Sequence, residues 1–235
     1  MMYSEPAPGP WATEQIGRPS DDELFARGIE SGVNFSKYED IPVKVTGEYP
    51  IPKAMESFKD SRLRWKLRSN IERSGYRTPT PVQKRAIPII LAGRDMMACA
   101  QTGCGKTAAF LLPIIHNLLE NPVPDGEERT QLPARPRAVI MSPTRELAIQ
   151  IWNEARKFCY QTPMRCVVVY GGTSRQFQLH ELEQGVEILI ATPGRLLDYV
   201  DEGVIIFEKC RFIILDEADR MLVMGFNQYI QKLIR

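Results

Sequence analysis

Histidine is scarce in this chain, which has 2 among its 235 residues, and the cysteines show no paired spacing. Neither His116 nor His180 belongs to a Ser-His-Asp pattern or to a metal-ligand spacing, so we expect both to be structural. The cysteines are Cys99, Cys104, Cys159, Cys166 and Cys210. Their odd number, wide spread and lack of any Cys-x-x-Cys pair indicate reduced thiols and disfavour a disulfide framework or a zinc site.

Long apolar runs and an excess of charge are also missing. No run approaches the ~18 residues that span a bilayer, and the N-terminus has no basic segment followed by an apolar one. We therefore expect no membrane association, no signal sequence and a cytosolic or nuclear location. The formal net charge is +1, so bulk electrostatics gives no argument for nucleic-acid binding, and any such argument must come from local residues.

Residues 1–50 are rich in Pro, Gly, Ser and acidic residues and show no sustained helical or strand period. We expect this segment to be an extended and partly disordered extension, followed by one domain over residues 51–235. Apolar residues such as Leu24 and Phe25 could dock on a neighbouring domain or stay free, and the sequence leaves both possibilities open.

Short apolar runs alternate with helical patterns through the rest of the chain. The runs cover residues 96–99, 138–141, 166–170, 188–191 and 212–215, and each is short enough to be a buried strand. This alternation predicts an α/β fold in which a parallel sheet has helices on both faces. In such sheets the functional residues gather at the carboxyl ends of the strands.

Residues 100–107 read Ala-Gln-Thr-Gly-Cys-Gly-Lys-Thr, between the apolar run 96–99 and a helical pattern that begins near Ala108. Strand, Gly-containing turn and helix form a cradle for a nucleoside triphosphate, because backbone N–H groups and the positive helix end face the phosphates. In such a loop Lys106 reaches the terminal phosphates and the Thr107 hydroxyl contacts Mg²⁺. A plain turn is the alternative, and the first residue is Ala where the strict pattern has Gly.

Asp216 and Glu217 follow the apolar run 212–215 directly. At the end of this predicted strand, the Asp216 carboxylate can hold Mg²⁺ through water. Glu217 beside it can orient and deprotonate the water that attacks the γ-phosphate. The alternative is that acidic residues after a strand cap the next helix, as Asp219 could.

Six ordered motifs together resemble the DEAD-box RNA helicases. They are Gly75-Tyr76 with residues 79–83, residues 100–107, residues 143–147, Gly171-Gly172, residues 192–195 and the Asp-Glu-Ala-Asp tetrad 216–219. Residues 32–38 and 41–47 are similar to the Vasa/Belle branch, and the resemblance covers essentially residues 30–235. It implies a RecA-like P-loop NTPase domain, ATP and Mg²⁺ as cofactors, RNA as partner and a monomer, located in the cytoplasm with perinuclear granules or the nucleus as alternatives.

For the nucleotide, the resemblance implies that Gln83 recognises adenine, that Tyr76 stacks on the base and that Phe58 is the upstream aromatic of the family. The loop residues Thr102, Gly103, Cys104, Gly105, Lys106 and Thr107 would hold the phosphates. Lys106, Asp216 and Glu217 would be the catalytic residues, with Thr107 and Asp216 at the metal. Simple core aromatics remain the alternative for Phe58 and Tyr76.

For RNA, the resemblance points to three strand-end motifs. Their residues are Thr144, Arg145, Gly171, Gly172, Thr192, Pro193, Gly194 and Arg195. Arginines and hydroxyls bind phosphates, and glycines let the nucleic-acid backbone approach main-chain N–H groups, so sequence-tolerant binding is expected. Arg145 alone could equally be a salt-bridged structural residue.

The chain departs from the family pattern in three places. Cys104 stands where the family usually has Ser, so we expect ATP binding with added sensitivity to thiol reagents. Val223 replaces a usual Asp, and the sequence offers no explanation for this change. The chain ends at Arg235, before the last strands of the domain and the second RecA-like domain, so we expect a C-terminally truncated first domain with an exposed sheet edge.

The leading hypothesis is therefore an ATP-dependent RNA helicase, present as its N-terminal ATP- and RNA-binding portion. Without the second domain's arginines we expect very low turnover, lower by about 10³ or more. The alternative is a non-enzymatic ATP- or RNA-binding fragment that docks a partner through residues 1–50. Gln83 and the acidic tetrad disfavour a third interpretation, a DNA-directed motor.

Overall fold

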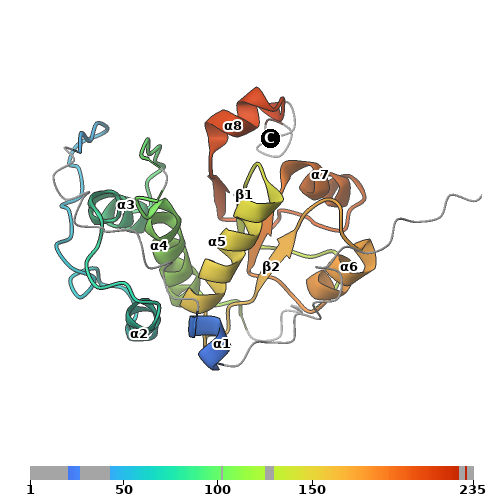
Figure 1. The fold of residues 1–235 in the computed structure, drawn as a ribbon, viewed down its shortest axis with the longest axis horizontal. Helices are drawn as coiled ribbons and strands as arrows, with labels where there is room; N and C mark the ends of the chain where they lie inside the picture. Colours follow the sequence, from blue (N-terminus) through green and yellow to red (C-terminus); the bar gives the residue numbers. More distant parts are fainter. Residues whose placement is uncertain (1–20, 27–42, 102, 125–129, 228–230, 232–235) are drawn as a thin grey trace, which may run out of the picture.

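The computed structural model describes residues 21–26, 43–101, 103–124, 130–227 and 231 (Figure 1). The helices are α1 (Asp21–Ala26), α2 (Trp65–Arg73), α3 (Pro81–Leu91), α4 (Lys106–Glu120), α5 (Arg145–Phe158), α6 (Arg175–Glu183), α7 (Pro193–Asp201) and α8 (Ala218–Val223). The strands are β1 (Ala138–Met141), β2 (Cys166–Val169), β3 (Ile188–Ala191) and β4 (Phe212–Leu215). Four of the five predicted strands are therefore confirmed, together with the helices between them.

The four strands form one parallel sheet in the order β2-β3-β1-β4. Met141 at the end of β1 pairs in register with Ala191 and Leu215, and Val169 pairs with Ala191. All four strands therefore end at one level, and the loops that follow them share one edge of the sheet. β4 lies at the side of the sheet, where Ile213 is 42% exposed.

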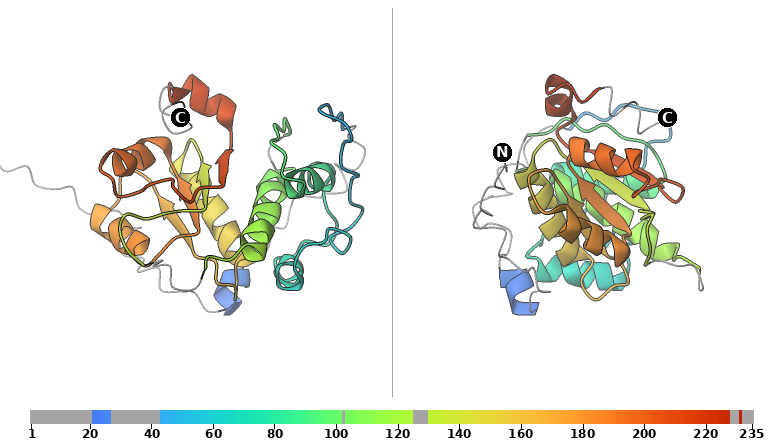
Figure 2. Two further views of the ribbon diagram at one scale, coloured as in Figure 1. Left: turned by 180° about the vertical axis from the view of Figure 1, so that it is seen from behind. Right: turned by 90° about the vertical axis from the view of Figure 1, so that its right-hand side faces the viewer.

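Alternate strand residues point to opposite faces, and each face has its own hydrophobic core. On one face, Ile140 and Ile190 pack with α2, α4 and α5; on the other, Val139 and Leu189 pack with α6, α7 and Met221 of α8. Figure 1 and Figure 2 show these two groups of helices on opposite sides of the sheet. The predicted parallel sheet with helices on both faces is confirmed.

The helix starts follow local sequence signals. Thr80 forms a capping box with Gln83 at the start of α3, and Thr144 accepts a hydrogen bond from Leu147 N at the start of α5. After α2 the chain turns at Gly75, whose φ of 89° favours glycine, as expected for a residue that closes a helix.

The prediction of a strand at residues 96–99 is wrong. These residues are not in a strand, and Met97 is 90% exposed. An apolar run becomes a strand only when a neighbouring strand supplies hydrogen-bond partners, and the sheet's order gives β4 no neighbour beyond β1 among the described residues. The phosphate loop is therefore preceded by an irregular stretch.

The N-terminal helix α1 lies beside α2 and below the end of α5 (Figure 1). The Phe25 ring meets Tyr160 edge-on at 5.4 Å, and the Arg73 guanidinium lies 4.3 Å from the centre of the Phe25 ring. Docking, one of the two possibilities left open, is thus confirmed for Phe25. Most of the predicted extension lies outside the described residues, and its boundary at residue 50 stays a prediction.

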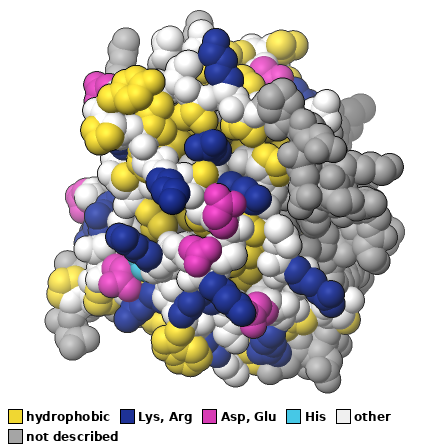
Figure 3. All heavy atoms as spheres, turned by 90° about the vertical axis from the view of Figure 1, so that its left-hand side faces the viewer, with side chains coloured by type: hydrophobic (Ala, Val, Ile, Leu, Met, Phe, Trp, Pro, Cys, Tyr) yellow, Lys and Arg dark blue, Asp and Glu magenta, His cyan; other side chains and the backbone are white. Residues whose placement is uncertain are grey.

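The basic residues around α2 lie on a surface of mixed charge. Figure 3 shows Lys and Arg side chains interspersed with Asp and Glu on the face that includes α2 and α3. Arg64, for example, forms an ion pair with Glu120 at 3.1 Å. Within the described ranges, no helix is long and apolar enough to cross a lipid bilayer.

Candidate functional site

The phosphate loop leads into the 15-residue helix α4 at Lys106. Gly103 and Gly105 have φ values of 79° and 86°, a backbone region that side-chain-bearing residues rarely adopt. Gly105 is the residue before the first turn of α4, so the positive end of the helix dipole lies at the loop. Thr102 lies outside the described residues.

Gln83 fixes the loop from the side of α3. Its side chain is fully buried, donates from Nε2 to the Gly105 carbonyl oxygen at 3.0 Å and accepts at Oε1 from Thr80 N at 2.9 Å. A Cβ atom at position 105 would lie 2.4 Å from Gln83 Nε2, so any larger residue there would have to displace the Gln83 amide. Gln83 therefore lies beside the loop, and both ends of its amide form hydrogen bonds within the protein. Recognition of adenine by Gln83 stays a prediction.

Lys106 folds back onto the start of the loop, where Nζ donates to the Ala100 carbonyl oxygen at 2.5 Å. This bond closes the loop across the turn. A phosphate in the loop would offer the ammonium group a charged acceptor in place of a neutral carbonyl, and such bonds are roughly twice as strong.

Asp216 lies at the end of β4, and its backbone N–H donates to the Met141 carbonyl oxygen at 2.9 Å. Burial raises the pKa of its carboxyl group, while the positive charge of Lys106 opposes that shift. Lys106 and Asp216, 110 positions apart in the chain, are therefore close enough to interact electrostatically. The loop and the acidic tetrad meet in one site.

Glu217 has a left-handed backbone, with φ 52° and ψ 46°, which is uncommon for glutamate. Arg220 Nη1 donates to its Oε2 at 2.7 Å, and the backbone N–H of Glu217 donates to Asp216 Oδ1 at 3.1 Å. The sharp turn separates the two carboxyl groups: Asp216 is buried, whereas Glu217 is held toward α8. Val223 at the end of that helix is 89% exposed, and nothing in the structure explains its replacement.

Two properties of Cys104 argue against the expected sensitivity to thiol reagents, which stays a prediction. The residue is 6% exposed, and burial raises the pKa of its thiol, so little of the reactive thiolate is present. The positive charge of Lys106 opposes this shift without reversing it. The sequence suggested reactivity because Cys104 stands where the family usually has Ser, and the structure places Cys104 among the residues that line the adjoining pocket.

Phe58 and Tyr76 lie in the hydrophobic core, 6% and 9% exposed. Their rings meet edge-on at 6.3 Å, and the Tyr76 hydroxyl donates to Glu154 Oε1 at 2.8 Å. This arrangement favours the alternative of core aromatics. Stacking on adenine stays a prediction that would require these rings to leave the core.

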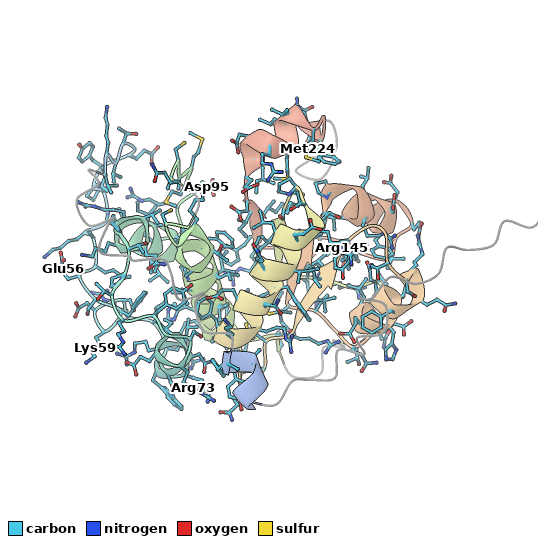
Figure 4. All side chains as sticks on the ribbon, viewed as in Figure 1. Glu56, Lys59, Arg73, Asp95, Arg145 and Met224 are labelled. Atoms are coloured by element: carbon cyan, nitrogen blue, oxygen red, sulfur yellow. The ribbon has the colours of Figure 1, made fainter. Side chains whose placement is uncertain are left out.

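The candidate RNA residues follow β2, β3 and β1 in spatial order, next to the acidic tetrad after β4. After β1, Thr144 caps α5, and Arg145 is the first residue of that helix (Figure 4). The Arg145 guanidinium lies 4.8 Å from the centre of the Tyr170 ring. After β2, Gly171 and Gly172 are exposed, and a Cβ at either position would meet no atom within 4 Å. The two loops therefore lie side by side.

After β3, residues 192–195 begin α7. Pro193 is buried at the first helical position, while Gly194 is exposed with open space around it. The Arg195 side chain is held inward, with Nη1 donating to the Tyr199 hydroxyl at 3.4 Å and Nε 3.8 Å from Asp198 Oδ2. Gly194 is thus the more accessible of these residues, and RNA contacts by Pro193 and Arg195 stay predictions.

Sequence reasoning missed Gln178 as a supporting residue. This buried side chain of α6 donates from Nε2 to the Tyr170 carbonyl oxygen at 2.9 Å and accepts at Oε1 from Tyr170 N at 3.3 Å. Both ends of one amide therefore fix the residue that precedes Gly171. A glutamine within a short amphipathic helix gave no distinct signal for this role.

The residues of the loop fit a nucleotide with a magnesium ion. The loop combines left-handed glycines, the N-terminus of a long helix, an ammonium group and, in Thr107, a hydroxyl group, with the Asp216 carboxylate opposite. Beside it lies a pocket of about 1010 Å³, lined by parts of residues 43–52, by α3, and by residues 93–101 and Cys104. This volume is ample for a nucleotide.

A family model described as DEAD/DEAH box helicase matches residues 80–235. The chain belongs to this family. Its four-stranded parallel sheet is accordingly part of a RecA-like domain, and residues 216–219 are the tetrad that gives DEAD-box proteins their name.

Curated relatives point to the Vasa-like branch. The chain is 53% identical over 218 residues to the ATP-dependent RNA helicase vasa of Drosophila melanogaster, covering 92% of this chain and 32% of that protein. It is 51% identical to a probable vasa-like helicase of Penaeus vannamei, with 92% and 30% covered, and 48% identical to the probable helicase DDX4 of Pelophylax lessonae, with 92% and 30% covered. The chain spans about a third of the length of these relatives.

Solved structures agree with this assignment. The RNA helicase Prp28 of Chaetomium thermophilum, in a crystal structure with bound ADP, is 35% identical with a TM-score of 0.75, covering 96% of this chain and 51% of that chain. A DEAD-box protein of the hyperthermophile Methanococcus jannaschii is 32% identical with a TM-score of 0.68, covering 77% and 46%.

Proposed function

We propose that this chain is the ATP- and RNA-binding portion of an ATP-dependent RNA helicase that acts in the cytoplasm. The observation that supports this most directly is the arrangement along one sheet edge. The phosphate loop and Asp216 lie at one end of that edge, and the exposed glycines after β2 lie at the other. Nucleotide and RNA would therefore bind along the same edge of the sheet.

The loop residues bind and orient the phosphates. Backbone N–H groups at the start of α4 donate to them, Lys106 exchanges its bond to Ala100 for a phosphate oxygen, and Thr107 and Asp216 hold the magnesium ion. ATP with magnesium supplies a phosphoanhydride bond whose cleavage can be coupled to RNA release. Gln83 keeps Gly105 in place throughout, through its hydrogen bond at 3.0 Å.

Glu217 orients the attacking water and accepts its proton. Its hydrogen bond from Arg220 Nη1, at 2.7 Å, holds the carboxylate in one orientation. The left-handed backbone at Glu217 turns this side chain away from the buried Asp216, so that two adjacent carboxylates serve different roles.

RNA binds through its backbone. Gly171, Gly172 and Gly194 let ribose and phosphate groups approach main-chain N–H groups, because no Cβ stands between them. Thr192, whose side chain makes no capping hydrogen bond, and Arg145 add polar contacts. None of these groups reads base edges, so binding tolerates many sequences.

The test is nucleotide binding and single-turnover ATP hydrolysis, each with and without RNA. Replacing Lys106 by Ala removes a charged hydrogen bond worth about 1.5–3 kcal/mol, so ATP affinity falls about 10- to 100-fold. Lys59→Ala, at an exposed lysine far from the loop, is the matched control and leaves affinity unchanged (Figure 4). Equal ATP affinity of Lys106→Ala and Lys59→Ala would overturn the proposed nucleotide site.

The proposed RNA binding is tested separately, by competition between RNA and DNA. Single-stranded RNA of unrelated sequences is expected to bind with similar affinity and to stimulate the single-turnover rate, while DNA of the same sequences competes poorly because it lacks 2′-hydroxyl groups. Hydrolysis that is indifferent to RNA would leave an ATPase without the proposed helicase role.

A further inference from the structure

Two cysteines meet at the end of the α5–β2 connection, away from the nucleotide and RNA residues. Cys159 follows the last residue of α5, and Cys166 is the first residue of β2. Their Sγ atoms are 3.6 Å apart and share a hydrogen bond. The sequence gave no hint of this pair, because its spacing is not that of a Cys-x-x-Cys site.

The backbone holds both residues in place. The Cys159 carbonyl oxygen accepts hydrogen bonds from Thr162 N at 3.0 Å and Thr162 Oγ1 at 2.6 Å. The Cys166 carbonyl oxygen accepts from Trp152 Nε1 at 3.1 Å, and Cys166 pairs with Ile188 in the sheet. The two sulfur atoms therefore face each other because of the fold, and a disulfide would require them to approach by about 1.5 Å.

The two thiols differ in accessibility. Cys159 is 5% exposed, and its hydrogen bond with Cys166 together with its burial holds the pKa of Cys159 well above the usual range. Cys166 is half-buried, and the Arg156 guanidinium lies within electrostatic reach of it. Cys166 is thus the more exposed of the two cysteines, and we expect a small oxidant from solvent to meet it first.

We propose that Cys159 and Cys166 form a peroxide-oxidisable dithiol site, in which Cys166 reacts first and Cys159 then closes a reversible disulfide between α5 and β2. The 3.6 Å separation places the second thiol beside the first product.

The chemistry balances with hydrogen peroxide as the oxidant. The Cys166 thiolate attacks one peroxide oxygen, so that an S–O bond forms, the O–O bond breaks, and the other oxygen leaves as water after taking up a proton. The Cys159 sulfur then attacks the sulfenic sulfur of Cys166; the S–S bond forms, the S–O bond breaks, and the hydroxyl leaves with the Cys159 proton as a second water molecule. Two thiols lose two electrons in total, and one peroxide molecule gains them.

The consequence is a covalent bond between the two elements that carry candidate RNA residues at their other ends. Thr144 and Arg145 lie at the start of α5, and Tyr170-Gly171-Gly172 follow β2. Oxidation would thus join α5 to β2 without touching the phosphate loop.

The sequence makes the disulfide easy to detect. Trypsin cleaves after Lys157, Arg165 and Arg175, which places the two cysteines on separate peptides, 158–165 and 166–175. The folded chain is treated with hydrogen peroxide and then unfolded in excess alkylating reagent, digested and analysed by mass spectrometry. We expect the two peptides linked with the loss of two hydrogen atoms, and released again by a dithiol reductant.

Variants separate the two roles. Cys159→Ser loses the linked peptide and accumulates a sulfenic acid on Cys166 that dimedone traps; Cys166→Ser loses the link and leaves Cys159 unoxidised. Cys210→Ser, at another half-buried cysteine, is the matched control and keeps the linked peptide. The proposal is overturned if the wild-type chain yields no linked pair at a peroxide dose that oxidises the exposed Cys99, or if Cys166 links instead to another cysteine.

Discussion

Gln83 Nε2 donates to the Gly105 carbonyl oxygen at 3.0 Å, across 22 positions of the sequence. The same amide closes the capping box with Thr80, so one side chain joins the start of α3 to the phosphate loop. This explains why position 105 has no space for a Cβ atom, which would lie 2.4 Å from that nitrogen. The shape of the loop depends on a residue outside the loop itself.

Gly105→Ala should therefore cost more stability than the same change at another left-handed glycine. Placing alanine in the left-handed region costs about 1–2 kcal/mol, and at position 105 the clash with Gln83 adds to this. Gly203→Ala, with φ 68° and no atom within 4 Å of the added Cβ, measures the backbone cost alone. Chemical unfolding of both variants gives the comparison, and ATP affinity should fall only for Gly105→Ala. Equal losses at the two positions would contradict a steric role for Gln83.

Tyr76→Phe should destabilise the chain by about 1–3 kcal/mol, because it leaves the Glu154 carboxylate without the hydroxyl that donates to it at 2.8 Å. Burial raises the pKa of Tyr76, so the hydroxyl keeps its proton and stays a donor. Tyr49→Phe, at a residue 86% exposed, is the control and should leave the unfolding free energy unchanged. An unchanged stability of Tyr76→Phe would show that the hydrogen bond adds nothing in solution.

Asp216→Asn should make the fold more stable at neutral pH. Burial raises the folded-state pKa of Asp216 above its unfolded value, so the folded chain holds this proton more tightly. The stabilisation of the folded state by the protonated Asp216 carboxyl group is fully present below the unfolded-state pKa. It is lost as the pH rises through the folded-state pKa. The stability gap between variant and wild type should accordingly shrink in acid. Urea unfolding at several pH values measures this difference in unfolding free energy. A difference that widens in acid would mean that folding lowers the pKa of Asp216.

Glu217→Gln should retain ATP binding and lower single-turnover hydrolysis by at least about 100-fold, because glutamine cannot accept the water proton. The change also removes the ion pair with Arg220, an exposed partner, so stability should fall by less than about 1 kcal/mol. Glu56→Gln, at an exposed glutamate far from the site, serves as the control (Figure 4). Hydrolysis at the wild-type rate in Glu217→Gln would remove Glu217 from the role of base.

Arg73→Ala should loosen α1. The guanidinium lies 4.3 Å from the centre of the Phe25 ring and 4.8 Å from that of Tyr160, and such contacts contribute about 0.5–2 kcal/mol. Hydrogen exchange of the α1 amides should become faster, while Arg77→Ala, at an exposed arginine nearby, should leave it unchanged. The same exchange rates in both variants would mean that α1 is held by other contacts.

The sheet and its helices could be predicted from the sequence because their signals are local. The four confirmed strands match their apolar runs to within one residue, and Thr80 and Thr144 mark helix starts by their own hydroxyl groups. The run at 96–99 failed for a non-local reason. A strand needs a partner strand, and periodicity carries no information about whether one is present.

The site was predicted unevenly. The loop, Asp216 and Glu217 could be found because each follows a strand or begins a helix in a fixed order. Three features of the site could not be predicted, since they depend on contacts between residues far apart in the sequence or on local conformation. They are the bond of Lys106 to Ala100, the two hydrogen bonds of the Gln83 amide and the burial of Tyr76. The contact between Cys159 and Cys166 could not be predicted either, because only the packing of α5 against β2 brings their sulfur atoms together.

The level ends of the strands limit how this domain can change in length. Met141, Val169, Ala191 and Leu215 lie in one register, so inserting or deleting one residue inside β4 would move Asp216 by about 3.3 Å and turn its side chain to the opposite face. Length changes in the connections at the other edge of the sheet leave this register as it is. Variation in length among natural sequences of this type should therefore concentrate there, in segments such as the one between α4 and β1.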